Sequence, residues 1–161
     1  MNKDIVIISG GRLGNPDFFR KSLKEIDNRL LICCDGGVRH LGASGFLPDV
    51  IVGDMDSIDP LQKAHYEHQG VEMIRHPANK DFTDTALALE YALSMKPRSI
   101  QIWGALGGRM DHAMANVYLL IRGKRSGVKT CLLDEFCEVF VAPADVRFEN
   151  AVGCVVSLLA L

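Results

Sequence analysis

Short runs rich in β-branched residues alternate with longer helical stretches over residues 1–134, and this alternation limits the fold more than any other feature of the chain. It is typical of a parallel sheet covered by helices, because each parallel strand needs a crossover segment before the next one. The predicted strands are Asp4–Ser9, Leu30–Cys34, Asp49–Val52, Val71–Arg75, Ser99–Trp103 and Lys129–Leu133. The predicted helices are Pro16–Ile26, Gly37–Leu41, Pro60–Gln69, Asp81–Met95 and Asp111–Ser126.

The pattern changes after Asp134. Apolar runs follow one another with short polar turns and no helical stretch between them, which predicts antiparallel strands. These runs are Cys137–Ala142, Val146–Phe148 and Val152–Leu159. We therefore expect an α/β domain over residues 1–134 and the beginning of an incomplete β domain over residues 135–161.

Composition narrows the class of protein. The chain of 161 residues is 48% hydrophobic and carries a formal net charge of -2, which gives no electrostatic reason to expect a nucleic acid or a membrane surface as partner. No apolar stretch approaches the ~20 residues of a membrane-spanning helix. The run Ile5–Ile8 is too short for the core of a signal peptide. A cytoplasmic protein with small-molecule ligands is expected.

Two aspartates, Asp54 and Asp56, directly follow the predicted strand Asp49–Val52. In extended backbone this spacing directs both carboxylates to the same side, at the edge where open α/β sheets bind their ligands. Two carboxylates this close repel each other unless a cation neutralises them, and oxygen ligands favour Mg²⁺ together with substrate phosphates. The alternative is a turn in which the aspartates accept hydrogen bonds from backbone amides.

A second polar cluster opens the helix predicted over Asp81–Met95. Asp81 and Asp84 are three residues apart and would share a helical face. Lys80 adds a cation and Thr83 a hydroxyl, so the cluster fits a phosphate and metal site. Helix capping and the helix dipole are the competing explanation for the acids.

A third cluster follows the strand that ends at Trp103. Gly107 and Gly108 would let backbone amides approach an anion closely, and Arg109 can bind a phosphate through two nitrogens. Asp111 and His112 begin the next predicted helix, where capping is again an alternative.

The fourth cluster, Asp35-Gly36-Gly37, also lies where a strand passes into a helix. Asp35 is a candidate for binding a ribose or a base, or for capping the helix. The shared placement of all four clusters at strand ends predicts one ligand site at the carboxyl edge of the sheet.

In this order the four motifs resemble thiamine pyrophosphokinase. They are Asp35-Gly36-Gly37, Gly53-Asp54-Met55-Asp56-Ser57-Ile58, Lys80-Asp81-Phe82-Thr83-Asp84 and Gly107-Gly108-Arg109-Met110-Asp111-His112. The resemblance implies a Rossmann-like sheet followed by an antiparallel β-sandwich, of which only the first strands would be present. It also implies Mg²⁺-dependent transfer of a diphosphoryl group from ATP to thiamine, giving thiamine diphosphate and AMP, in a homodimer.

The resemblance also implies roles for single residues. Asp54, Asp56, Asp81 and Asp84 would be the catalytic acids, the first three of them as metal ligands. The nucleotide and substrate would contact Asp35, Gly36, Gly37, Lys80, Thr83, Gly107, Gly108, Arg109, Asp111 and His112. Alternatives are a nucleotide-binding module without catalysis, and another Mg²⁺-dependent phosphotransferase or phosphatase.

Overall fold

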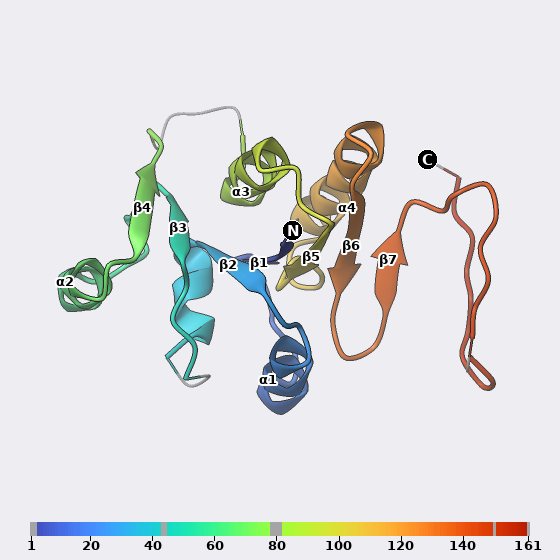
Figure 1. Ribbon diagram of the computed structural model, residues 1–161, viewed down its shortest axis with the longest axis horizontal. Coiled ribbons are helices and arrows are strands. Elements are labelled where there is room, and N and C mark those ends of the chain that lie inside the picture. The colour runs from blue at the N-terminus through green and yellow to red at the C-terminus, as the bar shows by residue number, and fades with distance from the viewer. Residues whose placement is uncertain (1–2, 43–44, 78–81, 150, 161) are drawn as a thin grey trace.

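The computed structural model describes residues 3–42, 45–77, 82–149 and 151–160, and its centre is a seven-stranded sheet (Figure 1). The strand order is β4-β3-β2-β1-β5-β6-β7. The strands are β1 (Asp4–Ile8), β2 (Arg29–Cys34), β3 (Val50–Gly53), β4 (Glu72–Arg75), β5 (Ser99–Trp103), β6 (Lys129–Leu133) and β7 (Glu138–Phe140). The helices are α1 (Pro16–Lys24), the 3₁₀ helix η1 (Asp35–His40), α2 (Pro60–His68), α3 (Asp84–Ser94) and α4 (Met110–Arg125).

The first six strands are parallel, and β1 lies in the middle with β2 on one side and β5 on the other. All five residues of β1 are buried, as expected for a strand covered by helices on both faces. From β1 the chain builds outward to β4 and then crosses back to β5. The direction of winding therefore reverses between β1 and β5, which is where ligands bind in open α/β sheets.

Each face of the sheet has its own hydrophobic core. On one face α1, η1 and α2 pack on the strands, and Phe19 of α1 meets Trp103 of β5 edge to face with ring centroids 5.1 Å apart. On the other face α3 and α4 cover the sheet with Leu89 and Leu120 (Figure 1). The α/β fold and its parallel strands, each within one residue of its predicted ends, are confirmed.

The predictions for the last part of the chain are partly wrong. Strand β7 is shorter than the predicted Cys137–Ala142, and it pairs antiparallel with β6 in the same sheet. The predicted strands Val146–Phe148 and Val152–Leu159 are irregular in the described residues. Val152 and Leu158 are almost fully exposed there. A segment with the sequence pattern of a strand becomes a strand only when a neighbouring strand pairs with it. The domain boundary after Asp134 remains a prediction.

Two helix starts also differ from the predictions. The chain turns into η1 at Asp35, two residues earlier than predicted. Helix α3 starts at Asp84 and not at residue 81, because Thr83 has extended backbone and its hydroxyl accepts a hydrogen bond from the Ala86 amide. None of the helices within the described residues is both long and apolar enough to cross a lipid bilayer.

An ion pair fixes the start of β1 to the start of β5. Arg98 Nε donates to Asp4 Oδ1 at 2.9 Å, a second Arg98 nitrogen donates to Oδ2, and the Ser99 hydroxyl donates to Oδ1 at 2.8 Å. These hydrogen bonds lower the pKa of Asp4, with Arg98 as the main cause. Stability from this carboxylate is therefore present above its unfolded pKa of about 3.8 and is lost as the pH falls through the lower folded value.

We expect Asp4→Asn to lower the free energy of unfolding by about 1–2 kcal/mol at pH 7. The loss should not be larger, because Asp4 is buried but its partner Arg98 is largely exposed to solvent. Urea unfolding at pH 7, and again below pH 3.8, measures this loss, which should shrink at the lower pH. Asp17→Asn is the control, because Asp17 pairs with Arg20 on the open surface and should contribute little. An equal loss in both variants would contradict the prediction.

Candidate functional site

A cleft of about 660 Å³ opens at the carboxyl edge of the sheet, around the point where the winding reverses. The loops after β1, β2, β3 and β5 and the first turns of α3 and α4 form its walls. The residues that line it are Ser9, Gly10, Gly11, Arg12, Cys34, Asp35, Gly36, Arg39, Asp54, Ser57, Phe82, Thr83, Asp84, Thr85, Gly104, Ala105, Gly107, Gly108, Arg109, His112 and Asn116. The structure therefore brings described residues from all four predicted motifs to one site.

Glycines allow the loops under this cleft to touch through their backbones. The Gly11 amide donates to the Gly104 carbonyl at 2.8 Å, and a Cβ added at Gly11 would lie 2.3 Å from that oxygen. A Cβ at Gly10 would come within 3.3 Å of the Gly36 backbone. From the side of η1, Arg39 donates to the Gly10 carbonyl. The loop after β1 is thus held between the loops after β2 and β5.

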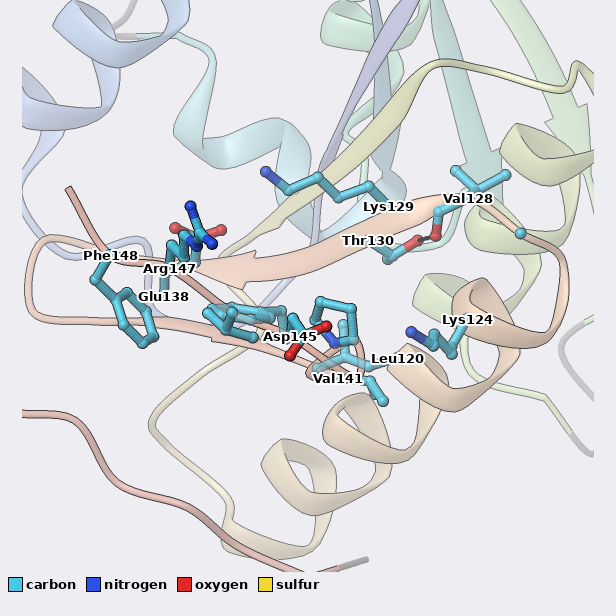
Figure 2. Close-up of a pocket in the computed structure, with 14 residues that line it drawn as sticks. Leu120, Lys124, Val128, Lys129, Thr130, Glu138, Val141, Asp145, Arg147 and Phe148 are labelled. Atoms are coloured by element: carbon cyan, nitrogen blue, oxygen red, sulfur yellow. Dashed lines mark hydrogen bonds between the residues drawn. The ribbon is translucent and has the colours of Figure 1, made fainter.

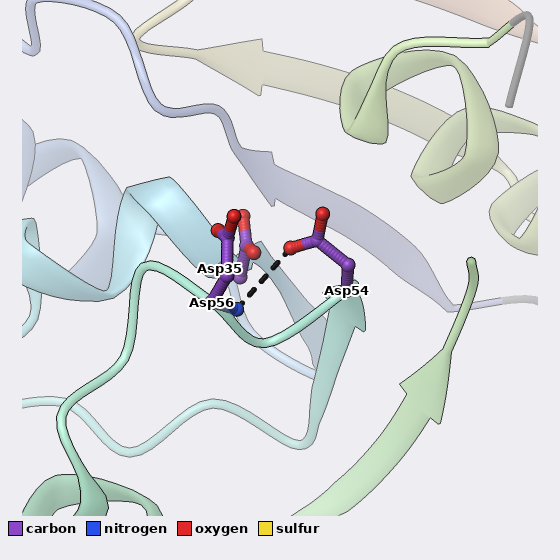
Figure 3. Close-up of side chains that lie close together, drawn as sticks. All are labelled: Asp35, Asp54 and Asp56. Atoms are coloured by element: carbon purple, nitrogen blue, oxygen red, sulfur yellow. Dashed lines mark hydrogen bonds between the residues drawn. The ribbon is translucent and has the colours of Figure 1, made fainter. Parts of the chain in front are cut away.

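Three carboxylates lie close together next to these loops (Figure 3). Asp35, Asp54 and Asp56 each offer an oxygen, and these oxygens lie within 4.8 Å of one another. Asp35 Oδ2 accepts a hydrogen bond from the Met55 amide at 3.2 Å, and Asp54 Oδ1 accepts one from the Asp56 amide at 3.2 Å. Asp35 thus belongs to the acidic cluster, which its prediction as a nucleotide contact did not include.

The backbone between the two aspartates differs from the prediction. Met55 has a φ of 69°, in the left-handed region that residues other than glycine rarely occupy, so this segment is a turn and not an extended strand. The predicted alternative of a hydrogen-bonded turn is therefore correct for Asp54. The turn nevertheless brings Asp54 and Asp56 to the same place, so the turn and the acidic cluster occur together.

The electrostatics of the cluster favour a bound cation. Asp35 is buried, and burial together with its hydrogen bond to Asp54 raises the pKa of Asp35 to about 6. The nearby charge of Asp84 adds to this rise. Carboxylates whose ionised forms repel one another are stabilised by a hard cation with oxygen ligands, so the donor set fits Mg²⁺.

The start of α3 contributes two of the predicted residues. Thr83 and Asp84 both line the cleft. Thr83 caps the helix, a role that was predicted as an alternative only for the neighbouring acids, and it also lines the cleft. The predicted residues Lys80 and Asp81 lie outside the described residues.

The start of α4 is arranged differently from the prediction. Gly107 and Gly108 have φ values of 76° and 74°, so the turn before α4 requires residues that tolerate left-handed backbone. Arg109 binds Asp111 through two nitrogens, at 3.1 and 2.6 Å, which lowers the pKa of Asp111 to about 2. Arg109 and His112 line the cleft, whereas Asp111 does not line it and contacts Arg109 instead.

Gly37 does not line the cleft either. A Cβ at this position would lie 2.5 Å from the Ile8 carbonyl, so Gly37 allows η1 to pack against the end of β1.

Sequence reasoning missed several residues of the cleft. Ser9, Gly10 and Gly11 line it, although the loop after β1 matches no phosphate-binding motif. Asn116 is buried and donates to the Ala105 carbonyl at 2.9 Å. It lies four residues after His112 and thus on the same helical face, a spacing that could have identified it.

A second cavity, of about 650 Å³, lies between α4, β6, β7 and residues 141–148 (Figure 2). Its wall combines apolar side chains with the charged residues Lys124, Lys129, Glu138, Asp145 and Arg147. None of the predicted site residues within the described part of the chain lines it.

The doubly wound sheet, with an acidic and glycine-lined cleft at its switch point, defines an α/β domain of the nucleotide-binding type. Residues 22–132 match the family model for the thiamin pyrophosphokinase catalytic domain. The chain belongs to this family, and the resemblance of its four motifs is confirmed.

Individual relatives agree with this assignment. Thiamine pyrophosphokinase of Bacillus subtilis is 37% identical over 109 residues, which are 68% of this chain and 51% of the relative. Thiamine pyrophosphokinase 1 of rice, Oryza sativa subsp. japonica, is 35% identical over 136 residues, with 71% of this chain and 51% of the relative covered. The chain thus spans about half the length of these curated relatives.

Solved structures show the same fold. The crystal structure of the Bacillus subtilis enzyme matches with a TM-score of 0.70 at 33% identity, over 83% of this chain and 61% of that one. Thiamin pyrophosphokinase from Candida albicans matches with a TM-score of 0.72 over 86% of this chain and 60% of that one. At 20% identity, the second match supports the fold alone.

Proposed function

We propose that this domain carries out Mg²⁺-dependent transfer of a diphosphoryl group from ATP to thiamine, giving thiamine diphosphate and AMP. Family membership supports the substrates. The observation that carries the proposal is the acidic cluster of Asp35, Asp54 and Asp56, with oxygens within 4.8 Å of one another. Asp35 and Asp54 line the cleft, and Asp56 lies beside them. This is a donor set for a cation that accompanies a triphosphate.

In this proposal Asp54 and Asp56, with Asp35 beside them, hold Mg²⁺, and Asp81 is the further predicted ligand. When bound, Mg²⁺ neutralises charge on the phosphates of ATP. Arg109 and the predicted Lys80 bind phosphate oxygens and stabilise charge that develops on them. Gly10, Gly11, Gly36, Gly107 and Gly108 allow the chain to approach the nucleotide closely.

The remaining task of the site is to orient the acceptor. The thiamine hydroxyl has to meet the β-phosphorus of ATP in line with the departing AMP oxygen, and phosphoryl transfer depends chiefly on such positioning. Asp84 is the proposed acceptor of the hydroxyl proton, because it lines the cleft in the first turn of α3. Thr83 and His112 border the same space and would contact the substrates.

We also propose a homodimer in the cytoplasm, with residues 135–161 belonging to the β domain that the resemblance implies. Sedimentation of the chain at several concentrations tests the dimer. A monomer at every concentration would contradict it for this chain.

The activity is tested by incubating the protein with ATP, Mg²⁺ and thiamine, both as this chain and in a version extended by the β domain. Equal amounts of AMP and thiamine diphosphate are expected from the extended version. Calorimetry with ATP measures binding to the chain itself, which should require Mg²⁺. Absence of Mg²⁺-dependent ATP binding, or binding without AMP formation in the extended version, would overturn the proposal.

Asp56→Asn should weaken Mg²⁺–ATP binding or slow AMP formation at least about tenfold, or about 1.4 kcal/mol, because it removes one charge from the cation site. The Tm should change little, since Asp56 is exposed and, among the described residues, its side chain accepts a hydrogen bond only from Ser57. Asp59→Asn is the matched control, with near-normal binding expected, because Asp59 is an exposed acid that caps α2 and does not line the cleft. Unfolding of the Asp56 variant would indicate a structural role for this aspartate.

A further inference from the structure

Buried polar side chains gather at the cleft. Of the six that are buried in the described residues, only Asp4 and Thr130 lie elsewhere, while Ser9, Asp35, Thr85 and Asn116 line the cleft. Burying a polar group is unfavourable unless it is hydrogen-bonded, so each of these groups needs a partner. Asp35 and Asn116 have backbone partners.

Ser9 and Thr85 are instead each other's partners. Their hydroxyl oxygens lie 2.6 Å apart, and the two residues are only 5% and 6% exposed. Ser9 directly follows β1, and its amide donates to the Trp103 carbonyl at 2.8 Å, so its backbone is fixed by the sheet. Thr85 is the second residue of α3. The pair therefore joins the switch point of the sheet to the start of α3.

This hydrogen bond uses one of the two hydroxyl hydrogens of the pair. Each hydroxyl has one donor hydrogen, and the residue that accepts in the pair keeps its own hydrogen for another acceptor. Within the part of the chain that the structure describes, neither hydroxyl makes any other hydrogen bond. Thr85 lies in the first turn of α3, so no earlier turn of this helix provides a carbonyl to receive the hydrogen.

The surroundings indicate which acceptor the second hydrogen meets. Ser9 and Thr85 both line the cleft, together with Gly10, Gly11, Arg12 and Arg109. Glycine backbone and arginine are typical neighbours of bound phosphate. The carboxylates of the acidic cluster follow β2 and β3, whereas Ser9 follows β1 at the switch point.

We propose that the Ser9–Thr85 pair donates its second hydroxyl hydrogen to a phosphate oxygen of the bound nucleotide. The inference rests on the proposed function, because it takes a triphosphate as the ligand. It assigns phosphate binding to two residues outside the four motifs of the family. It also gives the start of α3 a fixed position relative to β1 when the nucleotide binds.

The test measures the affinity of the chain for Mg²⁺–ATP, inorganic tripolyphosphate and adenosine by calorimetry. We expect the double variant Ser9→Ala/Thr85→Val to weaken binding of ATP and tripolyphosphate about tenfold, since a hydrogen bond to a charged acceptor is lost. Adenosine binding should be unchanged. The single variants should lose less than half of this effect on a logarithmic scale, because the remaining hydroxyl can turn toward the phosphate.

Two further variants separate binding from stability. Thr85→Ser keeps the hydroxyl and should bind as the unaltered chain does. Thr130→Val removes a buried hydroxyl that is bonded to the Val128 carbonyl away from the cleft, so it should lower the Tm and leave tripolyphosphate affinity unchanged. If the double variant does not fold, Ser9→Ala and Thr85→Val decide the question. Each should still weaken tripolyphosphate binding about twofold to threefold and leave adenosine binding unchanged, and no loss in either variant would overturn the proposal.

Unchanged tripolyphosphate affinity in the double variant, with or without a lower Tm, would overturn the proposal and leave the pair a structural contact. A chain that binds no tripolyphosphate would overturn it as well. A chain that binds ATP through these hydroxyls but forms no AMP in the extended version would contradict only the proposed function, so the two failures are distinguishable.

Discussion

Replacing Gly11 with alanine is expected to slow AMP formation about 100-fold, because a displacement of about 1 Å at a reacting centre can cost that much. The added Cβ would lie 2.3 Å from the Gly104 carbonyl oxygen, a distance that real structures do not tolerate. The Gly104 oxygen belongs to the backbone, and the position of the added Cβ is fixed by the backbone of residue 11, so no side-chain rotation relieves the clash. The loops after β1 and β5 must move apart at the switch point. Steady-state assays in the extended version measure the rate.

Gly42→Ala is the matched control for this substitution. Nothing lies within 4 Å of a Cβ added at Gly42, so the same chemical change should leave the rate unaltered. The Gly11 variant should also lose roughly 1–3 kcal/mol of stability, as overpacked sites typically do. A Gly11 variant with a normal rate would show that the loop after β1 does not position the substrates.

The sequence predicts the sheet well because buried parallel strands leave a strong local pattern. β1 and β3 contain continuous apolar runs bounded by polar residues, and their ends can be found without knowing the fold. The segment after β7 has a similar local pattern but remains irregular. Strand formation there depends on a pairing partner, and no local feature of residues 152–159 specifies one.

The site likewise contains residues that the local sequence predicts and residues that only the folded chain brings together. Asp54 and Asp56 were predictable because two acids close together after a strand are unusual. Asp35 was identified as a candidate, but its place in the acidic cluster depends on how the loops after β2 and β3 pack. Ser9 and Thr85 meet across 76 positions of sequence, and neither residue is distinctive in its own segment. Such contacts follow from topology and not from a motif.

Asp35→Asn is expected to lower activity about 100-fold while making the metal-free protein more stable at neutral pH. Asp35 is only 3% exposed, it lies beside Asp54 and near Asp84, and its pKa is raised to about 6. A folded pKa above the unfolded value of about 3.8 means that ionisation opposes folding. The unaltered chain therefore loses stability as the pH rises through about 6, and the neutral amide avoids this loss.

The gain in stability should be about 1–2 kcal/mol at pH 8 in EDTA, smaller than the full pKa shift would allow, because the amide cannot accept both hydrogen bonds that Asp35 receives from Gly36 and Met55. Urea unfolding at pH 4.5 and pH 8 separates the two effects. The lost hydrogen bond acts at both values, whereas most of the benefit of removing the charge develops between pH 4.5 and pH 8. Added Mg²⁺ should reverse the order, since a cation stabilises the unaltered carboxylate cluster and binds the variant weakly. If Asp35→Asn gains no stability between pH 4.5 and pH 8 relative to the unaltered chain, the acids do not repel one another, and the physical reason for a cation at this cleft is lost.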